Sequence, residues 1–237
     1  KVNQLHEVVE EVLDAGKPFG LGLECGSKAE LLATLPHLES DESLLVCNGV
    51  KDAAMLSLVS SANIACGGHA SDPETMFRTL STAAANGVVV GAHPGYADRE
   101  GFGRRIIPMA PDEIGRMVAA QIGALMGVAA QVGVPVSYVK THGALANLAA
   151  RDRAVADAIV AAVQSIDPAL PILAISGTEG EVAARSAGAP VYSEIFADRA
   201  YNDDATLVDR SIPGSVIHDP EVAGKRMVEM VKAGAII

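Results

Sequence analysis

The sequence contains no tryptophan, and aromatic residues make up only 3% of its 237 positions. Hydrophobic residues nevertheless account for 49% and charged residues for 20%, a balance that argues against an intrinsically disordered chain. The scarcity of aromatic rings means that any core has to be built from Ala, Val, Leu and Ile. We therefore expect a globular protein with an aliphatic interior.

Basic residues are also scarce, with 18 Lys and Arg against 29 Asp and Glu and a formal net charge of −11. No basic stretch is present to displace counterions from a phosphate backbone, so we expect no nucleic-acid partner. The GxxxxGK[ST] pattern of a P-loop is absent as well, which excludes that kind of nucleotide site.

Cysteine is rare and shows no metal-binding or redox spacing. The chain has Cys25, Cys47 and Cys66, an odd number without a CxxC motif, which argues against a disulfide framework. No signal-peptide pattern opens the sequence, because Lys1 leads directly into an amphipathic stretch. Together these features predict a protein of the reducing cytoplasm.

One uncharged stretch, residues 117–139, is long enough to imitate a membrane span. It is rich in Ala, holds two glutamines and three glycines, and contains Pro135. We predict instead a helix that ends near Gly133, a turn and a strand, and we expect no association with a membrane.

Short apolar segments bounded by Gly and Pro alternate with helical patterns along the whole chain. The predicted strands are residues 19–24, 44–47, 62–66, 88–92, 136–140, 172–175 and 191–196, with a remnant at 1–4. This alternation is typical of parallel βαβ units. About eight such strands predict a TIM-like (β/α) barrel forming a single domain over 1–237. A doubly wound open sheet is the alternative, and both folds place their sites at the carboxyl ends of the strands.

A histidine follows each of three successive predicted strands. His69 lies in SSANIACGGHASDP, His93 in VVVGAHPGY and His142 in VSYVKTHG. Because the carboxyl ends of parallel strands meet at one end of a barrel, we expect the three imidazoles to converge. Such a cluster suits either a divalent metal or general acid–base catalysis. No local signature such as HExxH decides between the two.

Other polar side chains fall at or just after predicted strand ends. We expect a catalytic set of His69, Asp72, His93, Lys140 and His142, with the three histidines as the ligands if a metal binds. Asp72 is equally well explained as a helix cap, and Lys140 as a surface lysine. Arg104 and Arg105 in GFGRR, Arg199 in FADRAY, and Glu194 are the candidate substrate-binding residues. An arginine offers a planar fork of donors to a carboxylate or phosphate, but it can equally form surface ion pairs.

From about residue 52 onward the chain closely resembles the LamB/YcsF family, which comprises the A subunits of prokaryotic 5-oxoprolinases. The matching stretches are LSLVSSANIACGGHASDPETM, GAHPGYADREGFGRR, YVKTHGALANLAARD and LVDRSIPGSVIHDPE. The resemblance implies ATP-dependent hydrolysis of the small molecule 5-oxo-L-proline to L-glutamate, carried out with partner subunits B and C. ATP is the cofactor that it implies.

Residues 1–51 resemble something else, the PLP-binding barrel of biosynthetic arginine decarboxylases, through KVNQLHEVVEEVLDAGKPFGLGLECGSKAELLATL and SLLVCNGVKD. Lys1 would match the Schiff-base lysine of that family. We therefore expect a chimera, natural or engineered, of segments 1–51 and 52–237. We do not expect PLP to bind, because Lys1 is terminal and the decarboxylase's other cofactor contacts are absent.

The chain also departs from the LamB/YcsF pattern. The Asn-Ala-Asp-Leu-Gly-Glu and Val-His-Gly-Asp motifs are absent, and Glu24 is the nearest acidic substitute. Thr141 stands where the family usually has Pro, and Ala146 where it usually has Tyr. These differences predict weak turnover, and a barrel chimera without catalytic activity is the alternative.

Overall fold

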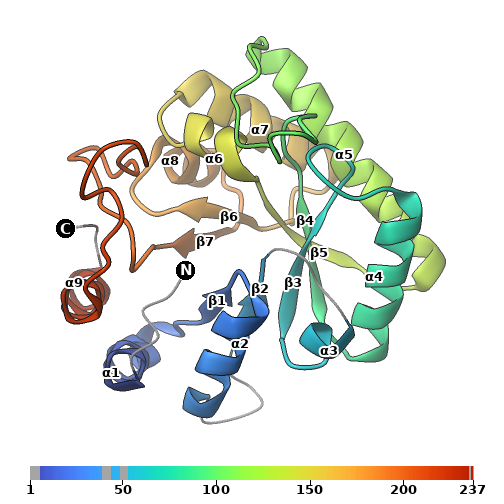
Figure 1. The fold of residues 1–237 in the computed structure, drawn as a ribbon. Helices are drawn as coiled ribbons and strands as arrows, with labels where there is room; N and C mark the ends of the chain where they lie inside the picture. Colours follow the sequence, from blue (N-terminus) through green and yellow to red (C-terminus); the bar gives the residue numbers. More distant parts are fainter. Residues whose placement is uncertain (1–5, 39–43, 49–52, 235, 237) are drawn as a thin grey trace.

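A computed structural model describes residues 6–38, 44–48, 53–234 and 236 (Figure 1). In this part of the chain, seven parallel strands form one sheet whose order follows the sequence from β1 to β7. The strands are β1 Leu23–Cys25, β2 Leu45–Cys47, β3 Ser61–Ala65, β4 Val89–His93, β5 Val136–Lys140, β6 Ile172–Ile175 and β7 Val191–Glu194. An order without a reversal rules out the doubly wound alternative and confirms the curled sheet of a TIM-like barrel. The predicted strand remnant at residues 1–4 lies outside the described residues.

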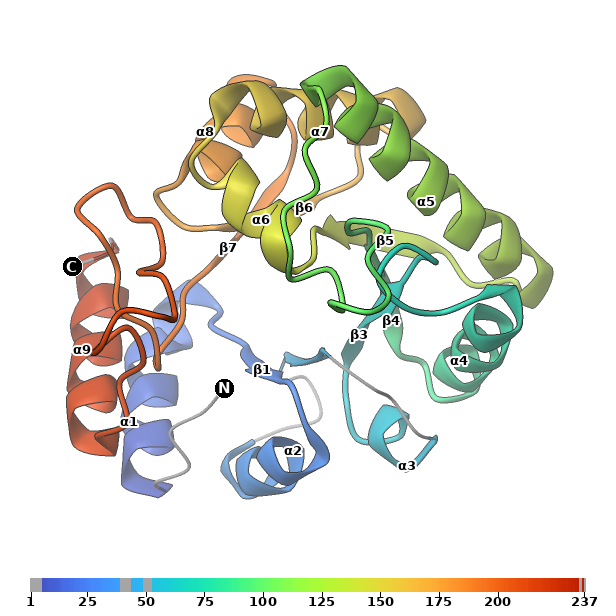
Figure 2. The same ribbon diagram turned by 45° about the horizontal axis from the view of Figure 1, so that its top comes forward.

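Helices surround the curled sheet on its outer side (Figure 2). They are α1 His6–Gly16, α2 Lys28–Thr34, α3 Ala53–Leu56, α4 Pro73–Ala85, α5 Pro111–Val132, α6 Gly143–Ala149, α7 Arg153–Ile166, α8 Glu179–Ser186 and α9 Pro220–Ala233, with short 3₁₀ turns η1 Lys17–Phe19 and η2 Leu35–His37. Each follows or precedes a strand as the alternating pattern predicts.

The uncharged stretch that imitates a membrane span is divided between a helix and a strand. α5 ends at Gly133, whose φ of 79° gives the left-handed conformation that glycine adopts easily, and β5 begins three residues later. Over the described ranges, no helix combines the length and the apolar character needed to cross a bilayer.

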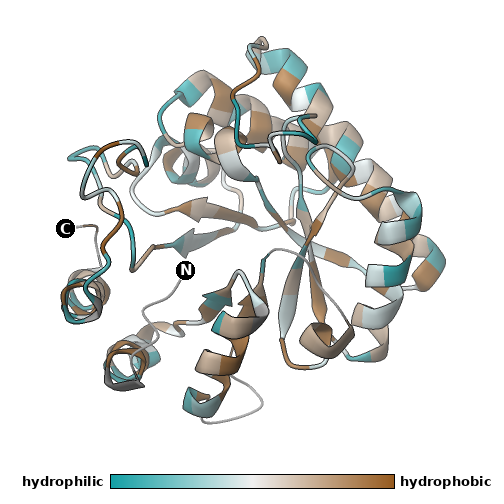
Figure 3. Cartoon of the chain, viewed as in Figure 1, coloured by the Kyte–Doolittle hydropathy of each residue, from teal (hydrophilic) through white to brown (hydrophobic). Residues whose placement is uncertain are grey.

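The main core lies between the sheet and the helices around it. β6 is apolar along its whole length (Figure 3). Leu80, Ile122 and Val163, from α4, α5 and α7, are fully buried in this core. The three cysteines are buried in the same core and form no disulfide with one another, and burial raises the pKa of Cys66 to about 12. That thiol is therefore a packing residue rather than a nucleophile.

α1 and α9 lie side by side where the two edges of the sheet approach each other (Figures 1 and 2). Among the described residues, β1 pairs only with β2 and β7 only with β6. A second apolar cluster joins the two helices and contains buried Val12, Met227, Met230 and Val231. The first and last helices of the described chain therefore cover the gap between the edge strands.

Gly224 sets how closely these two helices approach. A Cβ atom there would lie 2.2 Å from Cγ1 of Val8 and 3.0 Å from its Cβ. Gly224→Ala is therefore expected to lower the free energy of unfolding by about 1–3 kcal/mol, as overpacked cores do. Urea unfolding measures the change. The matched control Gly127→Ala, in α5 with open space around the added methyl, should instead gain up to about 1 kcal/mol from helix propensity.

A double variant separates the clash from other causes. Val8→Ala removes both γ carbons that the added methyl would meet and leaves only Val8 Cβ, 3.0 Å away, so the double variant should lose less stability than the two single changes together. Simple additivity of the two single changes would contradict the proposed helix contact.

Candidate functional site

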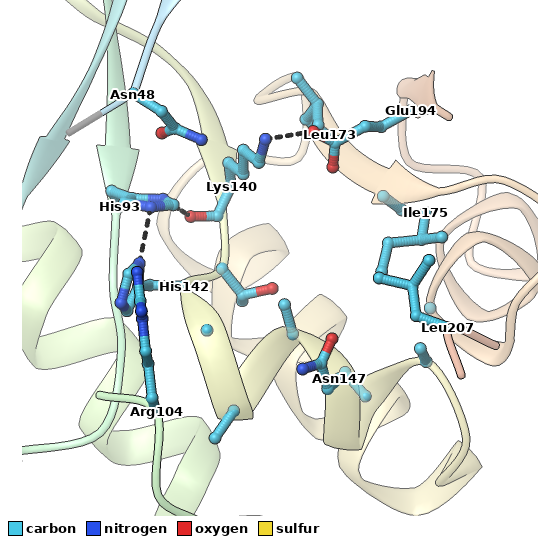
Figure 4. A pocket seen from close by; sticks show the side chains of 18 of the residues that line it. Asn48, His93, Arg104, Lys140, His142, Asn147, Leu173, Ile175, Glu194 and Leu207 are labelled. Atoms are coloured by element: carbon cyan, nitrogen blue, oxygen red, sulfur yellow. Dashed lines mark hydrogen bonds and ion pairs between the residues drawn. The ribbon is translucent and has the colours of Figure 1, made fainter. Parts of the chain in front are cut away.

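A cavity of about 980 Å³ opens at the carboxyl ends of the strands. Figure 4 shows its polar side chains converging from several strands, with Lys140 at the centre, His93 and His142 on one side and Glu194 on the other. The long loops that follow β4 and β7 complete the wall through Arg104 and Leu207. This is the end of a parallel barrel at which functional groups collect.

The structure brings the three histidines together. His69 lies in the turn after β3, His93 is the last residue of β4, and His142 caps the start of α6. One ring nitrogen from each lies within 4.8 Å of the others, and the rings of His69 and His142 stack with centroids 3.7 Å apart. His69 and His93 are buried, whereas His142 is partly exposed to the cavity.

Two backbone carbonyls fix which nitrogen of His93 and of His142 carries hydrogen. His93 Nδ1 donates to the carbonyl of Lys140 over 2.6 Å, and His142 Nε2 donates to the carbonyl of Phe102 over 2.7 Å. In a neutral imidazole the second nitrogen is then a lone-pair acceptor. The remaining nitrogens, His93 Nε2 and His142 Nδ1, face each other 3.0 Å apart. Two lone pairs in this position repel each other unless a positive charge is shared between the rings.

That positive charge can be a proton or a metal ion. Burial lowers the pKa of His93 well below its ordinary value, and burial also lowers the pKa of His142, so both rings disfavour the extra proton at neutral pH. Converging imidazole nitrogens are the ligand arrangement of divalent transition metals, and in His93 and His142 a backbone carbonyl fixes the opposite N–H. The residues present therefore fit a metal held by His69, His93 and His142.

The loop after β4 packs against the histidine cluster. Asp98 forms an ion pair with Arg105 and accepts a hydrogen bond from the Gly101 N–H at 2.9 Å, which closes the loop on itself. This places the Phe102 carbonyl against His142. Gly103 has a φ of 66°, and a Cβ there would lie 2.8 Å from atoms of both His69 and His142. The glycines of this loop are therefore required for its close approach to the rings.

The two predicted arginines of this loop have different surroundings. Arg104 borders the cavity, and its guanidinium lies 5.8 Å from the centre of the Phe102 ring. Arg105 pairs with Asp98, and Asp98 raises the pKa of that guanidinium. Arg104 therefore lies at the cavity, whereas Arg105 holds the loop.

Lys140 is a buried ammonium shared by two carboxylates from opposite ends of the sheet. Its Nζ donates to Glu24 Oε2 of β1 over 2.6 Å and forms a second ion pair with Glu194 of β7. Burial alone would lower the pKa of Lys140, but the two carboxylates together raise it above its ordinary value. Because one ammonium cannot neutralise both acids, burial and the nearby Glu24 raise the pKa of Glu194 to about 7. Glu194 is therefore poised to exchange a proton near neutral pH.

This carboxyl gives the protein a predictable pH dependence. A carboxyl whose pKa rises on folding binds its proton more tightly in the folded state. Its contribution to stability therefore falls as pH rises from its ordinary value of 4.5 to about 7, and levels off above that. We expect Glu194→Gln to remove this decline. Urea unfolding of both proteins at about pH 5 and about pH 8 tests it, and parallel pH profiles would contradict the assignment.

Two other predicted residues lie apart from the histidines. Asp72 is exposed at the start of α4, where its side chain accepts hydrogen bonds from the N–H and hydroxyl of Thr75, each at 2.9 Å. Arg199 is buried and borders the cavity, but it donates to the backbone carbonyls of Val208 at 2.6 Å and Ser215 at 3.2 Å. Arg199 therefore anchors the loop after β7, and neighbouring Asp198 also borders the cavity.

Sequence reasoning missed two asparagines in the cavity wall. Asn48 donates to Glu24 Oε1 over 2.6 Å, and Asn63 donates to Asn48 Oδ1 over 2.9 Å. The available signal was Asn63 itself, an amide in the apolar strand SANIA, since a buried polar residue needs an explanation. Thr141 and Ala146, which depart from the family pattern, also border the cavity.

Known proteins resemble this chain over most of its length. The 5-oxoprolinase A subunit of Gluconobacter oxydans (strain 621H) is 53% identical over 185 residues, covering 78% of this chain and 73% of the relative. The protein of the same name from Ruegeria pomeroyi is 50% identical over 186 residues, covering 78% and 74%. The crystal structure of a lactam utilization protein from Thermus thermophilus superposes with a TM-score of 0.68 at 45% identity, covering 77% and 74%.

A more distant likeness concerns the fold alone. The carboxyl transferase domain of Rhizobium etli pyruvate carboxylase matches 95% of this chain and 43% of that one, with a TM-score of 0.52 and 13% identity.

The sequence matches the LamB/YcsF family over residues 38–237. This match begins before the junction expected near residues 50–52. It therefore does not support a separate family origin for residues 38–51, and the expected chimera is not supported. Since it spans most of the protein, the chain belongs to the LamB/YcsF family.

Proposed function

We propose that this chain is the A subunit of a 5-oxoprolinase and contributes its cavity to the ATP-driven hydrolysis of 5-oxo-L-proline to L-glutamate. Relatives that are 50–53% identical carry that name. The observation that carries the proposal is the shared cavity in which three imidazoles lie beside a buried lysine flanked by two carboxylates.

The chemistry of lactam opening matches these groups. A water oxygen bonds to the ring carbonyl carbon, the carbon–nitrogen bond breaks, and the ring nitrogen receives a proton. The lactam consumes one water and ATP consumes a second, giving glutamate, ADP and phosphate. In this proposal His93, His142 and Glu194 take and return the protons. Among the cations that line the cavity, the ammonium of Lys140 and the guanidinium of Arg104 would meet the substrate carboxylate and developing negative charge.

ATP and partner subunits B and C complete the proposal. A lactam is a stable amide, and phosphoryl transfer from ATP would activate its carbonyl. If a divalent metal is part of the enzyme, His69, His93 and His142 would hold it, and when bound it would polarise an oxygen of the substrate or of water. Because the reaction consumes ATP, we expect it to take place in the cytoplasm.

Reconstitution tests the proposed function directly. The purified chain is combined with subunits B and C, 5-oxo-L-proline and ATP, and glutamate and ADP are measured. Glutamate formation that depends on this chain supports the proposal. Production no higher than in a mixture without the chain overturns it and favours the chimera without activity. Elemental analysis of the purified protein tests the metal, and finding none bound would contradict that part.

A further inference from the structure

A chain of polar side chains crosses the inside of the barrel from β5 to β3. Lys140 donates to one oxygen of Glu24, and the other oxygen of Glu24 accepts from Asn48 at 2.6 Å. Asn48 Oδ1 in turn accepts from Asn63 at 2.9 Å. This hydrogen-bonded series therefore runs from the ammonium of Lys140 to the buried amide of Asn63.

The ammonium of Lys140 sets the direction of every hydrogen bond in this series of side chains. An ammonium only donates and a carboxylate only accepts, so Glu24 has to receive the amide N–H of Asn48. That leaves the oxygen of Asn48 to receive the N–H of Asn63. The oxygen of Asn63 is then the last group, and it can only be an acceptor.

This final oxygen is buried in the wall of the cavity. Asn63 is 1% exposed, and its Oδ1 receives no hydrogen bond from any of the residues that the structure describes. One layer deeper the barrel is filled, because the ring of Tyr138 lies over Gly91 and its hydroxyl contacts Ser61 at 2.8 Å. Asn63 itself lines the cavity, from which a bound ligand can offer it a donor. Leaving such an acceptor unsatisfied is costly, which makes it a recognition group.

We propose that Asn63 Oδ1 accepts a hydrogen bond from the ring N–H of the bound lactam and makes the site selective for a secondary cyclic amide. This rests on the proposed function, since 5-oxoproline supplies the N–H donor. The lactone with a ring oxygen in place of the N–H would place a lone pair against the Asn63 oxygen. Its binding is disfavoured both by the lost hydrogen bond and by that contact.

The test compares two ligands that differ at one atom. Binding of 5-oxo-L-proline and of its lactone counterpart, 5-oxotetrahydrofuran-2-carboxylate, is measured by calorimetry on the assembled enzyme without ATP. The expected result is tighter binding of the lactam by about 10–100-fold. Equal binding overturns the role of Asn63 and leaves the proposed function standing. Binding of neither ligand overturns the proposed function and this inference with it.

Variants assign the preference to a residue. Asn63→Ala should bring the two affinities close together, and so should Asn63→Leu, which has nearly the same volume as asparagine but no acceptor. The matched control Asn86→Ala removes an exposed amide at the end of α4, outside the cavity lining, and should retain the preference for the lactam. If Asn63→Ala fails to fold, Asn63→Leu decides the point, because it also lacks the acceptor and leaves no cavity in the wall. Retention of the full preference in a folded Asn63→Ala protein contradicts the assignment.

Discussion

Replacing Lys140 with methionine is expected to lower the free energy of unfolding by about 3–5 kcal/mol, the usual result of removing one partner from a buried ion pair. Methionine fills a similar volume but leaves Glu24 and Glu194 without their shared ammonium. The side chains of Lys140 and Glu194 are only 8% and 13% exposed, so water cannot replace that charge effectively. Urea unfolding near neutral pH measures the loss.

Two comparisons isolate the cause. Lys17→Met removes an exposed lysine whose ammonium lies 2.8 Å from Asp14, and it should change stability by no more than about 1 kcal/mol. Combining Lys140→Met with Glu24→Gln and Glu194→Gln removes the uncompensated charges and should restore most of the stability without restoring activity. A triple variant as unstable as Lys140→Met alone would show that packing, not charge, holds this part of the barrel.

His93→Gln is expected to reduce glutamate formation by about 10²–10⁴-fold, the range lost when a positioned proton-transfer group is removed. Glutamine keeps a donor for the Lys140 carbonyl but takes away the nitrogen that faces His142. The imidazole cluster then loses its converging lone pairs, whether they hold a proton or a metal. The reconstituted assay with subunits B and C measures the effect.

The control for this variant is His218→Gln, which changes an exposed histidine away from the cluster. It should retain wild-type activity. Thermal unfolding of both variants checks that each is folded before activity is compared. A folded His93→Gln protein with nearly full activity would remove the imidazole cluster from the chemistry.

The order of elements could be predicted because Gly and Pro mark nearly every strand end. Where boundaries were wrong, local turns were the reason. The segment 19–24 reads as a strand, but Pro18 favours the 3₁₀ turn Lys17–Phe19, and Gly20 closes it with a φ of 65°. β1 therefore starts only at Leu23. Similarly, β7 ends at Glu194, although the apolar pattern continues to Phe196.

The convergence of the histidines was predictable, because three strand ends in a parallel sheet must share one end. The partners of Lys140 were not. Glu24 lies 116 residues away from it, and their contact depends on how tightly the sheet curls. The separate surroundings of Arg104 and Arg105 were equally hidden, since they depend on which of two adjacent guanidiniums reaches Asp98. Sequence patterns locate an end of a barrel better than the contacts made across it.

The pairing of α1 with α9 has a consequence for how the protein forms during translation. The ribosome releases α1 long before α9, so Val12 has to wait for Met227 and Met230 to emerge before its apolar surroundings are complete. Until then the apolar face that α1 presents to α9 has no partner in that helix. Nascent chains halted before α9 are therefore the stage at which association between neighbouring polypeptides is most favoured.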